Sequence, residues 1–189
     1  MSESKKQHAF VLYVENEPGV LNRVASLFRR RGYNIESLTV GHTERPGVSR
    51  MTILAGISEG ASQRVEANLY KLVNVLSVED VTFAPTISRS LALLKIEAHD
   101  ESRHRLMEVV RVFRARVVDL APRSLIIEIT GTENKIQALV DVLRPFGILE
   151  MVRTGQVVMS RGVERAASDD GAATPELSLE AEASASVSV

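Results

Sequence analysis

The residue types and spacing best suited to bind a ligand lie in one short stretch, Asn16 to Val24, directly after the apolar run Ala9 to Val14. An extended segment there meets the pair Pro18-Gly19, and a helical pattern of apolar residues starts at once. The first N–H groups of a helix have no partner within the helix and carry a positive partial charge. This stretch, called the Pro-Gly corner below, is predicted to bind a small anion such as the carboxylate of an amino acid.

Simpler interpretations of the same residues stay open. A Pro-Gly pair before a helix often does no more than start the helix. Asn16 can cap the helix or hydrogen-bond a ligand, and Glu15 and Glu17 are expected to favour the positive helix terminus rather than act as acid and base. Asn34 offers a donor and an acceptor, of which the acceptor suits an ammonium group, or it is a turn residue after Gly32.

The rest of the sequence lacks the signatures of common enzymes. It has no cysteine, which excludes disulfides, thiol catalysis and thiolate metal sites. Motifs of dinucleotide-binding, P-loop, zinc-protease and serine-hydrolase proteins are missing. The nearest pair of histidines, His99 and His104, is expected to lie on the surface. We therefore predict a chain that is not an enzyme and that itself binds no metal or cofactor.

Charge and aromatic content argue against nucleic acid as a partner. The net charge is −1 and aromatic residues make up 4% of the chain, whereas proteins that bind RNA through a βαββαβ fold need exposed rings and basic surfaces. The run Arg29 to Arg31 is expected to complement a helix C-terminus, and the alternative is a contact with an acidic partner or a phosphate. A second basic stretch, from Arg103 to Arg116, is either a solvated face or a contact with another protein.

Hydrophobic periodicity divides the chain into two similar halves, each in the order βαββαβ. In the first half we expect strands at 8–14, 34–40, 50–57 and 75–83, and helices at 19–31 and 62–72. In the second half we expect strands at 90–97, 117–121, 125–130, 148–152 and 157–159, and helices at 102–114 and 133–143. The predicted fold class is α+β, with two ferredoxin-like domains whose helices cover one face of an antiparallel sheet.

The predicted domains span residues 8–83 and 90–162, with a linker near 84–89 around Pro85. Residues 164–189 are rich in Ala, Ser, Glu and Asp, and we expect a disordered acidic tail there. No apolar run is long enough for a membrane span and no signal peptide is recognisable, so a cytoplasmic protein without a membrane partner is expected.

The open face of the first sheet is expected to need cover. Leu38, Val40, Met51 and Ile53 alternate along two strands and suggest that this face is not fully wet. A second copy of the chain is a plausible cover, so a homodimer is predicted.

Several strings of the sequence resemble the regulatory (small) subunit of acetohydroxyacid synthase, also called acetolactate synthase. The resemblance extends from about His8 to Gly162. The strings that carry it are Glu15-Asn16-Glu17-Pro18-Gly19-Val20-Leu21, Arg31-Gly32-Tyr33-Asn34-Ile35-Glu36-Ser37-Leu38-Thr39-Val40, Ser49-Arg50-Met51-Thr52-Ile53, Lys71-Leu72-Val73-Asn74-Val75, Leu94-Lys95-Ile96 and Met159-Ser160-Arg161-Gly162.

The resemblance implies that the first half is an ACT domain, an amino-acid sensor. Dimers of this family bind branched-chain amino acids, chiefly valine, between two ACT domains. The subunit joins a large catalytic subunit, which carries thiamine diphosphate, Mg and FAD. It raises that subunit's activity and confers feedback inhibition on the synthesis of valine, leucine and isoleucine. The alternative is a free-standing ACT protein that controls transcription or another pathway.

Carried onto this chain, the resemblance assigns an effector site to residues of the Pro-Gly corner and of the strand that starts at Asn34. Backbone N–H groups would hold the ligand carboxylate, two asparagine side chains would add hydrogen bonds, and an isoleucine would line the apolar pocket. The backbone N–H groups are those of Gly19, Val20 and Leu21. The asparagines are Asn16 and Asn34, and the isoleucine is Ile35. Gly41 departs from relatives with alanine there, which could alter the fit of the pocket.

Overall fold

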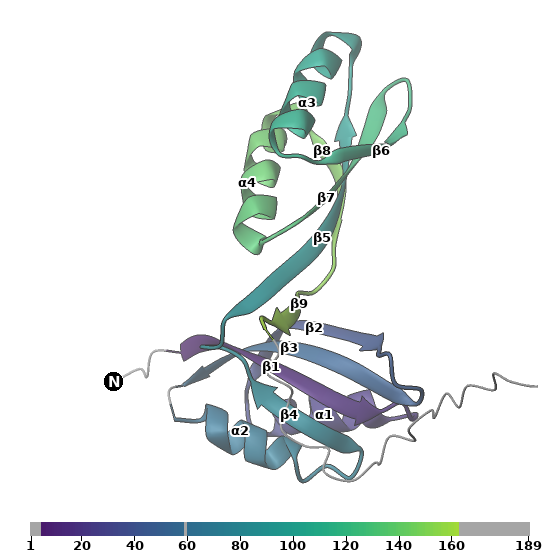
Figure 1. Cartoon of the computed structure of the whole chain (residues 1–189). Helices are drawn as coiled ribbons and strands as arrows, with labels where there is room; N and C mark the ends of the chain where they lie inside the picture. The colour runs from purple at the N-terminus through teal and green to yellow at the C-terminus, as the bar shows by residue number, and fades with distance from the viewer. Residues whose placement is uncertain (1–4, 59, 163–189) are drawn as a thin grey trace, which may run out of the picture.

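The computed structural model describes residues 5–58 and 60–162, which form two units, each a sheet with two helices on one face (Figure 1). The first unit has a four-stranded sheet in the order β2-β3-β1-β4. Its elements are β1 (Lys5–Glu15), α1 (Val20–Arg30), β2 (Asn34–His42), β3 (Val48–Ser58), α2 (Ser62–Leu69) and β4 (Val75–Asp80).

The second unit repeats this topology in the order β6-β7-β5-β8. Its elements are β5 (Thr86–Glu97), α3 (Asp100–Val112), β6 (Arg116–Leu120), β7 (Ser124–Gly131), α4 (Glu133–Leu143), the 3-10 turn η1 (Arg144–Phe146), β8 (Ile148–Arg153) and β9 (Val157–Ser160). The predicted α+β fold with two βαββαβ units is confirmed. None of the described helices is long and apolar enough to cross a membrane, and the predicted tail at 164–189 lies outside the described residues.

The core of the first unit follows from alternation along β1. Phe10, Leu12 and Val14 are fully buried on the face that α1 and α2 cover, because side chains of a strand alternate between its two faces. Phe28 of α1 meets Phe10 edge to face with the ring centroids 6.5 Å apart. The helix periodicity and the strand alternation thus converge on one aromatic pair.

Replacing Phe10 by alanine should lower the free energy of unfolding by about 3–5 kcal/mol, because the change removes a fully buried ring and leaves a cavity against Phe28. Urea denaturation followed by circular dichroism measures this loss. The exposed ring of Phe83, 81% accessible, provides the matched control, and Phe83→Ala should change stability far less. Equal losses in the two variants would contradict this view of the core.

The prediction that Leu38, Val40, Met51 and Ile53 lie on the open face of the first sheet was wrong. Leu38 pairs with Ile53 and Val40 with Met51, and Met51 and Ile53 belong to the core beneath the helices. They therefore lie on the covered face. Alternation could not reveal this, because most of β3 is buried on both faces.

The chain covers much of the open face with its own C-terminal strand. β9 lies across the sheet on the side opposite α1 and α2 (Figure 1), where Val158 packs with Val11 and Val81. The need for cover is therefore no argument for a second copy at this face.

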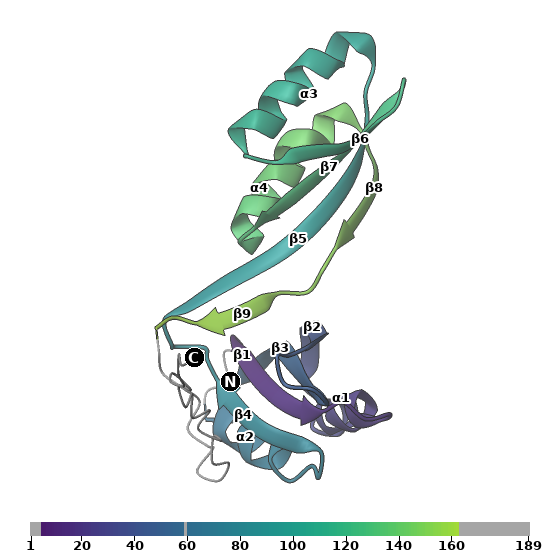
Figure 2. The same ribbon diagram turned by 45° about the vertical axis from the view of Figure 1, so that its right-hand side comes forward.

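The predicted linker at 84–89 is shorter in the structure, because β5 begins at Thr86. Residues 86–89 pair with β9 in an antiparallel ribbon, from Thr86 opposite Ser160 to Arg89 opposite Val157 (Figure 2). Pro85 stands just before this ribbon, where its missing N–H costs no ladder hydrogen bond. One long strand thus runs from the first unit into the centre of the second.

Candidate functional site

The Pro-Gly corner joins the end of β1 to the start of α1. Gly19 is the residue before the helix and has φ +85°, in the left-handed region, which favours glycine because it has no Cβ. The helix has no side-chain cap. Asn16 therefore does not cap it, since it lies three residues before Gly19. Its own N–H donates to the carbonyl of Gly47 at 2.8 Å.

The corner presents free backbone donors. Among the described residues, no partner is found for the N–H groups of Gly19, Leu21 and Asn22, and the N–H of Val20 makes only a long bond of 3.4 Å to the carbonyl of Glu17. The side chain of Val20 is buried, whereas Leu21 is 44% exposed. Asn22 was not foreseen as a donor, and the number of free donors suits a carboxylate.

Asn74, just before β4, braces the corner. Its carbonyl accepts from the N–H of Glu15 at 2.9 Å, and its side-chain amide donates to the Glu15 carboxylate at 2.6 Å. The guanidinium of Arg23 donates to the Asn74 side chain at 2.5 Å. The Glu15 carboxylate is bonded to Asn74 rather than to the start of α1, so the expectation that it favours the helix terminus fails. For Glu17 the expectation stays a prediction. Sequence reasoning missed the role of Asn74, which only the pairing of β1 with β4 reveals.

Asn34 and Ile35 lie at the other end of the sheet. Asn34 and Gln7 of β1 both pair with Gly56 of β3, which lies between them. Asn34 is therefore level with Gln7. Gln7 is eight residues before Glu15, where β1 ends at the corner. At 3.3 Å per residue, that separates Asn34 from the corner by roughly 26 Å. Asn34 is exposed and Ile35 packs partly against the core. One chain therefore brings the corner residues together but does not bring Asn34 and Ile35 to them.

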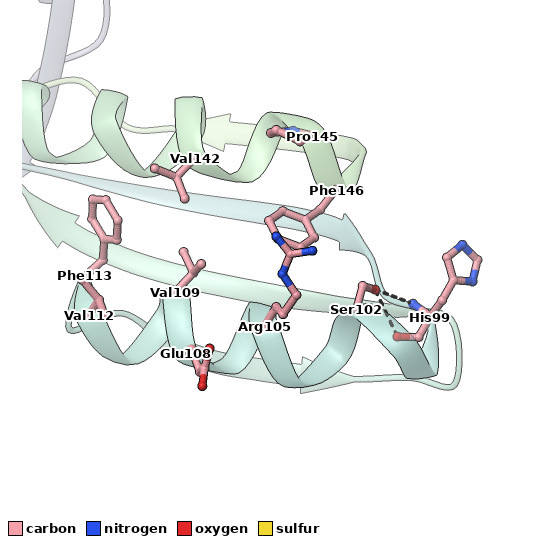
Figure 3. Close-up of a pocket in the computed structure, with 10 residues that line it drawn as sticks. All are labelled: His99, Ser102, Arg105, Glu108, Val109, Val112, Phe113, Val142, Pro145 and Phe146. Atoms are coloured by element: carbon pink, nitrogen blue, oxygen red, sulfur yellow. Dashed lines mark hydrogen bonds between the residues drawn. The ribbon is translucent and has the colours of Figure 1, made fainter.

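A hollow of about 830 Å³ lies elsewhere, between α3 and α4. Val109 of α3 and Val142 of α4 point toward one another across it, and Arg105 reaches over the ring of Phe146, 5.6 Å from its centroid (Figure 3). At its end, Ser102 and the backbone of His99 bond each other. A free amino acid needs convergent donors for its carboxylate, and this mainly apolar groove suits it less well than the corner does.

Other charged groups have structural partners. Arg103 donates to the carbonyls of Ala121 and Pro122, and Arg116 pairs with Glu128. The pKa of the Glu66 carboxyl on α2 is raised, first by burial and then by nearby carboxylates; this group is not part of the corner. Within residues 5–58 and 60–162, no three His, Asp or Glu side chains are placed to hold a metal ion.

The fold and the corner together define the class of protein. The first unit is a four-stranded βαββαβ sheet with a glycine-led helix N-terminus. Residues 10–77 match the family model described as AHAS small subunit-like ACT domain. The chain is therefore an ACT-domain protein. Residues 89–162 match a second model, described as small subunit of acetolactate synthase.

The chain belongs to the family of acetolactate synthase small subunits, the non-catalytic regulatory partners of a large catalytic subunit. It is 48% identical over 155 residues to the small subunit of Mycobacterium leprae, covering 82% of this chain and 92% of the relative. It is 46% identical over 159 residues to that of Mycobacterium bovis, covering 84% and 95%. The crystal structure of the small subunit from Thermotoga maritima matches with a TM-score of 0.78 at 37% identity, covering 83% and 98%.

Proposed function

We propose that the chain activates the large, thiamine-diphosphate-dependent catalytic subunit of acetolactate synthase and makes it subject to feedback inhibition by valine. The observation that carries the effector half of this proposal is the free set of N–H groups at Gly19, Leu21 and Asn22. Thiamine diphosphate, Mg and FAD belong to the catalytic subunit. The match of residues 89–162 to the small-subunit model weighs against a free-standing ACT regulator.

A dimer formed through β2 would complete the effector site. β2 is the outer strand of its sheet and pairs only with β3 among the described strands, so its other edge is free to pair. In a twofold dimer the two β2 strands run antiparallel. The Asn34 end of one β2 then lies beside the His42 end of the other. His42 is level with Val14, so it lies at the same end of the sheet as the corner. This arrangement supports a site built from the corner of one chain and Asn34 and Ile35 of the partner subunit.

Exposed apolar side chains support a branched-chain ligand at that place. Leu21 of α1 is 44% exposed and Val40 of β2 is 46% exposed, and Val40 faces the helix side because it pairs with Met51. With Ile35 of the partner subunit they would enclose a small aliphatic side chain. A pocket of this kind distinguishes valine from alanine by only about 1–3 kcal/mol, so we propose valine as the chief but not the exclusive effector.

Reconstitution with the catalytic subunit tests the proposed function. We expect the full chain to co-purify with that subunit and to raise its acetolactate production, because small subunits of this family accompany a large one. Added L-valine should then lower the activity, whereas L-alanine, which buries less apolar surface, should need a clearly higher concentration. Activation without any response to valine would contradict the effector assignment, and failure to associate would contradict the proposal as a whole.

A further inference from the structure

A short segment between β8 and β9 contacts the open face of β2. The hydroxyl of Thr39 donates to the carbonyl of Gln156 at 2.9 Å, and the N–H of Gln156 donates to the hydroxyl of Ser37 at 2.9 Å. The segment belongs to the second unit in sequence, yet it bonds side chains of the first. We call Gly155 and Gln156, with Ser37 and Thr39 beneath them, the β2 latch.

Glycine is required at position 155 by lack of space. A Cβ there would lie 2.7 Å from the hydroxyl oxygen of Ser37, 2.8 Å from the methyl carbon of Thr39 and 3.0 Å from the carbonyl oxygen of Leu38. All three distances are shorter than ordinary van der Waals contact, and one involves backbone that cannot rotate away. Gly155 does not have positive φ, so the constraint is close approach and not conformation.

The latch continues into the second unit. The side chain of Gln156 accepts a hydrogen bond of 2.8 Å from Ser88 of β5, and the N–H of Thr154 donates to the carbonyl of Leu91 at 2.9 Å. Arg50 of β3 donates to the carbonyl of Val158 in β9. A displacement of the latch would therefore break hydrogen bonds to β5, the strand that runs from the latch into the centre of the second sheet.

The same short length of β2 serves the latch and the proposed effector site. Ile35 and Leu38 pack against the core, while Ser37 and Thr39 support the latch. The pairing of β2 with β3 shifts between Ile35 and Ser37, which marks a bulge at Glu36. A bulge interrupts the ladder and lets a strand bend locally, and this one separates Asn34 and Ile35 from the latch.

We propose that the β2 latch is the contact through which effector binding at Asn34 and Ile35 is transmitted to the C-terminal unit. This proposal rests on the proposed function, since it needs an effector at β2. A ligand changes activity only if it favours one of two arrangements of the protein. The two arrangements are the closed latch seen here and one in which the latch has left β2. Gly155 fits against β2 only while Ser37, Leu38 and Thr39 keep their present positions, so a shift of β2 would favour the second.

Gly155→Ala tests the latch in the full chain reconstituted with the catalytic subunit. We expect valine to bind the isolated small subunit with a dissociation constant within about threefold of the wild type, because residue 155 does not touch the corner. Activation should persist, but the fraction of activity that survives saturating valine should rise roughly threefold or more, as the coupling is lost. Calorimetry measures the binding and an acetolactate assay measures the inhibition.

Gly131→Ala is the matched control. Gly131 ends β7 in the second unit and does not have positive φ. The nearest atoms that a Cβ there would meet belong to the flexible side chain of Lys135, so inhibition should stay as in the wild type. Thr39→Val is a second test that adds no bulk. It removes the donor to Gln156 and should weaken inhibition in the same direction as Gly155→Ala.

The outcomes separate the latch from the effector site. If Gly155→Ala and Thr39→Val both bind valine and are inhibited as fully as the wild type, the latch proposal is overturned while the proposed function stands. If the wild type neither binds nor responds to valine, both proposals are overturned. If Gly155→Ala binds valine but inhibition is lost, the latch proposal is supported, and retained binding shows that the ACT unit is folded.

Discussion

Gly19→Asp should raise the dissociation constant for valine by about 100-fold and remove feedback inhibition, while activation of the catalytic subunit is retained. The new carboxylate would stand beside the free N–H groups of Leu21 and Asn22, occupy the place of the ligand's carboxylate and repel it. A hydrogen bond to a charged group contributes about 1.5–3 kcal/mol. The loss of one or two such bonds gives about 3 kcal/mol, which corresponds to roughly 100-fold.

The effect should be local to the corner. A Cβ on Gly19 would meet no atom within 4 Å, so the substitution fits sterically and costs only the strain of a side chain at φ +85°, about 1–2 kcal/mol. Gly60→Asp is the matched control, because Gly60 has φ +86° and equally free space and also precedes a helix. Isothermal titration of both variants with valine decides the matter, and equal affinities would remove the corner from the effector site.

Local chemistry explains which features could be predicted from the sequence. The corner was found because Pro18-Gly19 before apolar residues at helical spacing marks a strand-to-helix junction wherever it occurs. The helix at Glu133–Leu143 was predicted to the residue, since its buried residues repeat at helical spacing and Thr132 caps it. The number and order of elements follow from patterns contained within about ten residues.

Long-range pairing explains what the sequence left open. The face of Met51 and Ile53 could not be assigned, because β3 is buried on both faces. One contact on its second face, from Arg50 to Val158 of β9, joins residues about a hundred positions apart. The brace at Asn74 depends on β4 pairing with β1. The distance between Asn34 and the corner depends on β3 lying between β2 and β1. Each of these facts is a matter of strand order, which short-range periodicity does not contain.

Strand order also determines where the proposed effector site would need a partner subunit. The corner has free donors but lies roughly 26 Å from Asn34 along the sheet, so under the proposed function one chain would hold two half sites at opposite ends. The open face is occupied by β9 and the β2 latch. The free edge of β2 remains for a second copy, and antiparallel pairing there would join each corner to Asn34 of the partner subunit.

Complementation between two inactive variants should reveal such a shared site. Asn34→Ala, at an exposed position, should weaken valine binding about 10- to 100-fold, the value of one hydrogen bond to a charged group. Neither this variant nor Gly19→Asp alone should bind at valine concentrations near the wild-type dissociation constant. When the two are co-expressed, each mixed dimer has one site with an intact corner and an intact Asn34.

An equal mixture should therefore recover about a quarter of the wild-type sites, since half of the dimers are mixed and each has one intact site of two. Calorimetric stoichiometry of the co-expressed protein measures this fraction, and the affinity of the recovered sites should equal that of the wild type. The control is a chain that carries both substitutions, co-expressed with the wild type. If the site is shared, each mixed dimer of this control has two sites, and each site has one substituted residue.

A site contained in a single chain gives a different result. The mixture of the two single variants would then recover no sites, and the control would retain half of them. The two mixtures together therefore distinguish a shared site from an internal one.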